Sequence, residues 1–256
     1  MINTANYPLA RERNLILGAL ILLAAAAWAV LVRQSLMMDD EDMGLAMGMS
    51  APLFVAIWAA MMVAIMFPTA APMILMFARI QSNRQERRQV LVPTWLFISS
   101  YLVIWMATGV LAYLAAWLGD SLAADSMWFT DNGMRIGGAV LIIAGLYQFS
   151  PLKLSCLGKC RTPMSFILSS WRDGTKGAIR MGVEHAVYCF GCCWLLFLIL
   201  FPLGMMNIAA LALITLLIFA EKTLAIGPAL ARSVAVLLIA YGALVLAVPQ
   251  ALPTMM

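Results

Sequence analysis

The chain has 256 residues, of which 64% are apolar and only 11% are charged, and its mean hydropathy is +0.95. A composition this apolar excludes an ordinary soluble globular domain. The net charge of +4 does not indicate a nucleic-acid partner, because the basic residues fall in short segments between apolar runs, where membrane topology explains them.

About seven apolar runs follow one another along the chain, most of them near the length of about 20 residues that a helix needs to cross the hydrocarbon core. We therefore predict an all-α fold in which residues 1–256 form a single transmembrane domain, a polytopic helix bundle in the lipid bilayer. The predicted spans are residues 14–32, 52–77, 92–118, 134–149, 178–201, 205–220 and 228–248. Pro68 and Pro72 are expected to kink the second span.

The basic residues gather at alternate ends of these spans. If the N-terminus is cytoplasmic, all of the 16 Lys and Arg residues except Arg33 and Arg135 fall at the cytoplasmic side. Because short cytoplasmic loops are enriched in Lys and Arg, we predict a multi-pass protein with a cytoplasmic N-terminus and the C-terminus outside. The acidic run 39–42 then lies in an outside loop, either as a solvated face or as a weak cation-collecting patch.

The second span carries four methionines that fall within about 80° of one another on a helical wheel. They are Met62, Met66, Met73 and Met76. Methionine stripes commonly serve packing. The alternative is a track of thioethers for Cu(I).

The segment 150–176 is basic and contains Cys156-x3-Cys160, a spacing that brings both sulfurs together on a helical turn. Cytoplasmic thiols stay reduced, so a structural disulfide is not expected. A metal relay, a second metal site and a redox switch stay open, as do two unpaired loop thiols. Pro151, Pro163 and Trp171 favour a structured, re-entrant or interfacial segment.

The stretch 177–222 concentrates the reactive residues, with the only histidine and three of the five cysteines. At about 100° per residue, four side chains share one helical stripe about 80° wide: Met181, His185, Cys189 and Cys192. Cys193 lies at the flank of this stripe, and Glu184 lies on another face, where it can pair with Arg180.

Imidazole and thiolate bind Zn(II) and Cu(I), and thioether joins them for Cu(I). The candidate metal ligands are therefore His185, Cys189, Cys192 and Cys193. Because one helix cannot close a tetrahedral shell, further ligands or orienting residues are expected among Met181, Glu184, Met206, Glu221, Cys156 and Cys160. A histidine inside a span indicates function, whereas cysteine is also a common packing residue.

Glu221 follows the sixth apolar run and is expected near the depth of His185, because the fifth and sixth spans form an antiparallel hairpin. Its carboxylate could accept the second ring N–H of His185, as is usual for a ligand histidine. The alternative is an interfacial Glu221–Lys222 pair that reaches water.

Several sequence blocks between Trp58 and Lys222 carry a resemblance. They are His185-x3-Cys189-x-Gly191-Cys192-Cys193-Trp194, Met206-Asn207, Glu221-Lys222, Trp58-x2-Met61-Met62-x5-Pro68-Thr69-x2-Pro72-Met73, Tyr147-Gln148-x2-Pro151-x-Lys153-x2-Cys156-x3-Cys160-Arg161 and Trp171-Arg172-x-Gly174. With these blocks the chain resembles an uncharacterised family of bacterial polytopic membrane proteins described as predicted metal-binding. The resemblance implies a metal site and a bacterial inner (plasma) membrane, but no particular activity.

Together these features predict an integral membrane protein that binds or transports a soft cation, with copper favoured over zinc as the metal ion. Two alternatives stay open: an accessory or structural subunit that joins partner membrane proteins in a larger redox complex, and a metal-dependent membrane redox enzyme. The single histidine argues against a di-haem cytochrome of b type.

Overall fold

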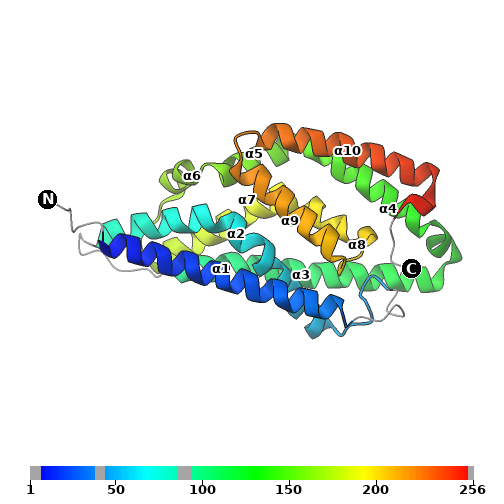
Figure 1. The fold of residues 1–256 in the computed structure, drawn as a ribbon, viewed down its shortest axis with the longest axis horizontal. Coiled ribbons are helices and arrows are strands. Elements are labelled where there is room, and N and C mark those ends of the chain that lie inside the picture. Colours follow the sequence, from blue (N-terminus) through cyan, green and yellow to red (C-terminus); the bar gives the residue numbers. More distant parts are fainter. Residues whose placement is uncertain (1–6, 38–43, 86–93, 253–256) are drawn as a thin grey trace.

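The computed structural model describes residues 7–37, 44–85 and 94–252, and all regular structure within these ranges is helical (Figure 1). The predicted all-α fold is confirmed. The acidic run 39–42 and the first two residues of the predicted span 92–118 lie outside the described residues.

Of the helices in the described part of the chain, six are long and four are shorter. The long ones are α1 (Tyr7–Ser35), α2 (Ala51–Gln85), α3 (Thr94–Asp125), α4 (Met127–Gln148), α7 (Gly174–Leu198) and α10 (Gly227–Ala247). The shorter ones are α5 (Pro151–Arg161), α6 (Pro163–Ser170), α8 (Leu200–Leu203) and α9 (Ile208–Thr223), and the 3₁₀ turn η2 (Pro249–Ala251) follows α10.

Five segments of the described chain are long and apolar enough to cross a membrane. They are Arg13–Ser35, Ala51–Gln81, Thr94–Asp125, Gly174–Leu203 and Gly227–Ala247. A sixth candidate consists of α4 and α5 together, a pair bent by 64°. This count is smaller than the seven predicted spans.

The remaining predicted span, 205–220, corresponds to α9. This helix has 16 residues, so it extends about 24 Å at 1.5 Å per residue, whereas the hydrocarbon core is about 30 Å thick. In Figure 1, α9 (orange) runs back between α7 and α10.

The helices pack in pairs. α1 lies along α2, α3 along α7, and α4 along α10. Small residues permit the last of these contacts, because a Cβ added to Gly242 would lie only 2.7 Å from the carbonyl oxygen of Gly138. Such close approach of backbones is a usual basis of helix association in membranes.

α2 lies at the centre of the bundle and continues as one helix through Pro68 and Pro72. Its middle turns are buried on all sides, as expected for a helix surrounded by others. Met61, Met62 and Met66 are completely buried. The predicted kink stays a prediction, since the helix is not interrupted.

The basic segment 150–176 is structured, as predicted, and folds into α5 and α6. The bend before α5 has a local cause, since Ser150 caps the helix by accepting a hydrogen bond from the Lys153 N–H, and Pro151 occupies the first turn. α5 then packs against α7. The structure therefore carries Cys156 and Cys160 into the helix bundle, where both are buried.

Candidate metal centre

The Cys189 thiol is the meeting point of four helices. On α7 its Sγ lies 3.0 Å from Lys222 Nζ of α9, 3.1 Å from the Tyr101 hydroxyl of α3 and 3.7 Å from Met66 Sδ of α2. All four side chains are buried. A soft sulfur atom thus lies beside a thioether, a hydroxyl and an ammonium group in the interior.

Lys222 is the cation of this cluster, and its side chain is largely enclosed, with 8% of its surface exposed. Besides Cys189, Nζ lies 3.5 Å from Thr69 Oγ1 and 3.9 Å from Met66 Sδ. An ammonium group is the charge-complementary partner of a thiolate, which is the form of cysteine that binds metals.

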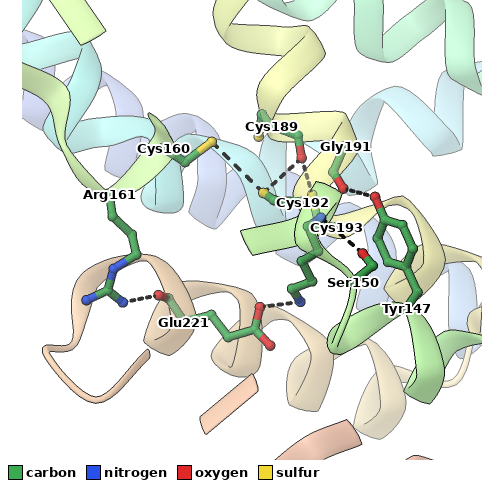
Figure 2. A network of polar contacts seen from close by, with 10 residues as sticks. Tyr147, Ser150, Cys160, Arg161, Cys189, Gly191, Cys192, Cys193 and Glu221 are labelled. Atoms are coloured by element: carbon green, nitrogen blue, oxygen red, sulfur yellow. Dashed lines mark hydrogen bonds and ion pairs between the residues drawn. The ribbon is translucent and has the colours of Figure 1, made fainter. Parts of the chain in front are cut away.

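A second sulfur pair lies beside the first. The Sγ atoms of Cys160 on α5 and Cys192 on α7 are 3.9 Å apart (Figure 2). Two thiolates that share one metal lie at most about 4.6 Å apart, because each metal–sulfur bond is about 2.3 Å long. The two sulfurs are therefore within reach of a single ion.

Cys192 and Cys193 both donate to the carbonyl oxygen of Cys189, at 3.1 and 2.7 Å. Cys193 therefore satisfies its thiol within its own helix. The backbone at Gly191 is also held from outside, since the Tyr147 hydroxyl donates to its carbonyl oxygen (Figure 2).

α5 lies close to α7 because Gly191 has no side chain. A Cβ at this position would lie 2.7 Å from Cys156 Sγ. Gly191 therefore brings α5, with Cys156 and Cys160, against the cysteine stripe of α7.

His185 lies one turn before Cys189 in an aromatic enclosure. Its ring is stacked on Tyr101 at 5.3 Å and on Phe97 at 6.0 Å, and Phe166 covers it at a tilt. Neither ring nitrogen has a hydrogen-bond partner within the described part of the chain. A buried polar group without a partner costs about 1–3 kcal/mol, so His185 is held in a position that packing alone does not favour.

Glu221 does not accept a hydrogen bond from His185, in contrast to the expectation from sequence. Its Oε2 accepts from Lys153 Nζ at 2.7 Å, and both side chains are almost fully buried. Arg161 donates to the Glu221 carbonyl oxygen (Figure 2). It also donates to the carbonyl oxygen of Ala225 at 3.3 Å. These contacts tie α5 to the end of α9, and they replace the suggested interfacial pair that reaches water.

The other residues singled out from the sequence take varied positions. Glu184 faces away from the cysteine stripe and pairs with Arg180 at 3.0 Å, as expected. Met206 precedes α9 and is thus separated from Lys222 by the length of that helix. Met181, Met62 and Met73 are buried, and Met76 is half-buried. Met66, the remaining methionine of the predicted stripe on α2, contacts Cys189. Together with Cys160, Cys189 and Cys192 it forms what we call the sulfur cluster.

The donor chemistry of the centre suits a soft cation. Within the described ranges no three His, Cys, Asp or Glu side chains are already arranged around a common metal position. The sulfur groups that do meet form two pairs, Cys160 with Cys192 and Cys189 with Met66. Thiolates bind both Cu(I) and Zn(II), and a thioether joins them as a ligand of Cu(I).

Sequence reasoning did not identify Tyr101, Lys153 or the role of Lys222. Tyr101 gave no signal, because an aromatic residue in an apolar run is ordinary. Lys222 gave a signal that could have been used, because a lysine at the end of an apolar run is a candidate for function. Lys153 lies within the Tyr147–Arg161 block but was counted only among the basic residues of the cytoplasmic side.

A family model for PpoB2, described as a copper chaperone, matches residues 55–245. The match covers most of the chain and includes every residue of the sulfur cluster. It agrees with the metal-binding part of the resemblance noted from the sequence. No curated protein and no solved structure matches the chain.

Proposed function

The chain belongs to the PpoB2 family of copper chaperones, and on that premise we propose that it binds Cu(I) within the helix bundle and delivers the ion to an acceptor protein. The observation that carries this proposal is a buried group of two sulfur contacts that meet along α7, Cys160 with Cys192 and Cys189 with Met66. Three helices contribute these sulfurs, so the site depends on the folded bundle.

The proposed ligands are the thiolates of Cys160, Cys189 and Cys192 and the thioether of Met66. The short distance between Cys160 and Cys192 and the contact of Cys189 with Met66 support this set. His185 is one helical turn away, and neither of its ring nitrogens has a hydrogen-bond partner among the described residues, which makes it a candidate nitrogen ligand for an ion that moves along α7.

Binding followed by delivery accounts for the burial of the centre. A site enclosed by helices excludes water and oxidants from Cu(I) and its thiolates. The apolar helices support a location in a lipid bilayer, and we assign the protein to a bacterial inner membrane with its N-terminus in the cytoplasm. In this orientation the α5 thiols lie toward the cytoplasmic side.

The proposal is tested by elemental analysis of the full-length protein, purified in detergent after anaerobic loading with Cu(I). The wild type is expected to hold close to one copper per chain, and Cys189→Ala/Cys192→Ala is expected to hold almost none while keeping its helix content. Copper retained in full by the double variant, or absent from the loaded wild type, would contradict the proposal.

A second experiment tests whether the Met66 thioether is a ligand, with Met62 on the same helix as the matched control. Met66 and Met62 are both completely buried on α2, one turn apart, and Met66 Sδ lies 3.7 Å from Cys189 Sγ. Met66→Leu is expected to weaken Cu(I) binding in competition with a chromogenic chelator, whereas Met62→Leu is expected to leave it unchanged. Equal affinities would remove Met66 from the ligand set.

A further inference from the structure

A cation already lies among the sulfurs of the centre. Lys222 Nζ is 3.0 Å from Cys189 Sγ, 3.5 Å from Thr69 Oγ1 and 3.9 Å from Met66 Sδ. The Thr69 hydroxyl donates to the Met66 carbonyl oxygen at 3.1 Å, so its lone pairs are available to the ammonium group. Three electron-rich atoms from two helices therefore converge on one positive charge.

Two of these atoms are the donors proposed for Cu(I), namely the Cys189 thiolate and the Met66 thioether. We propose that the Lys222 ammonium group occupies the cation position of the centre in the copper-free protein, and that Cu(I) binds by displacing it from Cys189. This inference rests on the proposed function and adds a residue that sets the affinity of the site.

The charges of the neighbourhood support an exchange. The nearby carboxylate, Glu221, is paired with Lys153 at 2.7 Å, and the hydrogen bonds of Lys222 go to Cys189, Thr69 and Met66. A lysine in the membrane interior is costly unless it has a counter-charge. The thiolate of Cys189 provides that charge in the copper-free state.

Cu(I) and the ammonium group cannot share this thiolate without cost. Two positive charges within a few ångströms repel strongly in an interior of low dielectric constant. When a Cu–S bond forms at Cys189, the N–H···S hydrogen bond to Lys222 is therefore expected to break. The lysine reduces the net affinity for Cu(I), and its return to the sulfur assists release, as a protein that delivers its ion requires.

The experiment compares Cu(I) affinities of the full-length protein in detergent, measured anaerobically by competition with bicinchoninate. Lys222→Met removes the charge at similar size and is expected to bind Cu(I) at least about tenfold more tightly, because close buried charge pairs interact by about 1.5 kcal/mol or more. Lys222→Arg keeps the charge and is expected to bind no more tightly than the wild type.

Lys159→Met is the matched control. Lys159 is half-buried beside Cys160 on α5, and the described residues show no hydrogen bond from it to a sulfur. The same change of charge is expected to leave the affinity near that of the wild type. Tightening by Lys159→Met equal to that by Lys222→Met would overturn the exchange, because a general charge effect would then explain both.

The two proposals fail in different ways. A wild type that binds no Cu(I) contradicts the copper function itself. A wild type that binds Cu(I), beside a Lys222→Met variant of equal or weaker affinity, contradicts only the exchange and makes Lys222 a stabilising partner of the thiolate.

A second measurement uses the wild type alone and so does not depend on the folding of a variant. Acetylation of Lys222 by isotope-labelled acetic anhydride, quantified by mass spectrometry, is expected to rise when Cu(I) is bound, since the amine then leaves its sulfur partner. Labelling of Lys222 that is unchanged by Cu(I) would overturn the displacement.

Discussion

Cys160 and Cys192 bring their sulfur atoms to 3.9 Å from each other although they belong to different helices, α5 and α7. Cys192 and the next cysteine, Cys193, both donate to the Cys189 carbonyl oxygen, at 3.1 and 2.7 Å, but among the described contacts only that of Cys192 reaches a thiol on another helix. The two members of the Cys192-Cys193 pair therefore have different surroundings. The thiol of Cys192 contacts a thiol of α5, whereas that of Cys193 is bonded within α7.

This difference predicts unequal effects of the same substitution. Cys192→Ala is expected to weaken Cu(I) binding by about 100-fold or more, since loss of even an orienting neighbour of a metal ligand costs about 10–100-fold. Cys193→Ala is expected to have a much smaller effect. Chelator competition measures both, and an equal loss in the two variants would show that Cys193 is a ligand as well.

His185→Phe separates the aromatic packing of the imidazole from its ring nitrogens. Phe97, Tyr101 and Phe166 surround this position, so a phenyl ring is expected to fit and to keep or raise the thermal stability of the copper-free protein. Cu(I) affinity is expected to fall by about tenfold if the imidazole contributes to binding. Unchanged affinity with full stability would assign His185 to packing.

The Lys153–Glu221 pair is expected to matter more when one partner is removed than when both are. Lys153→Met leaves Glu221 buried without its charge partner, and the expected cost is about 3–5 kcal/mol. The double variant Lys153→Met/Glu221→Leu replaces both charges by apolar groups and is expected to be far closer to the wild type. Thermal unfolding in detergent compares them, and additive losses would contradict a coupled pair.

Gly191→Ala tests whether α5 must lie close to α7. The added Cβ would meet Cys156 Sγ at 2.7 Å, so α5 is expected to move, with a loss of about 1–3 kcal/mol from overpacking and weaker Cu(I) binding. Gly158→Ala is the control on α5, since a Cβ there meets nothing within 4 Å. It is expected to stabilise the helix by about 0.5–1 kcal/mol.

The position of the C-terminus tests whether α9 completes a crossing. If α9, with its 16 residues, returns the chain across the bilayer between α7 and α10, the C-terminus lies opposite the N-terminus. Alkaline phosphatase fused after the last residue is then expected to be active in a bacterial host, and a fluorescent protein at the same place is expected to stay dark. The reverse result would mean an even number of crossings.

The helical fold was predictable because long apolar runs in lipid can satisfy their backbone only as helices. The stripe on α7 was predictable as well, since His185, Cys189 and Cys192 lie within two turns and their relative directions follow from helix geometry. The number of spans was harder to predict than the helices themselves. It depends on the length of α9 and on the 64° bend between α4 and α5, which are set by helix caps and prolines and not by the number of apolar residues in a run.

The sequence by itself thus determined the helices and which side chains share a face of α7. Only the tertiary structure decided what meets Cys189, since Lys222, Tyr101 and Met66 are 33, 88 and 123 positions away. In a soluble protein an amphipathic pattern would show which faces meet. In a membrane bundle the lipid is as apolar as the core, so helix pairing depends on close packing and a few buried polar contacts, and these exist only once the helices have come together.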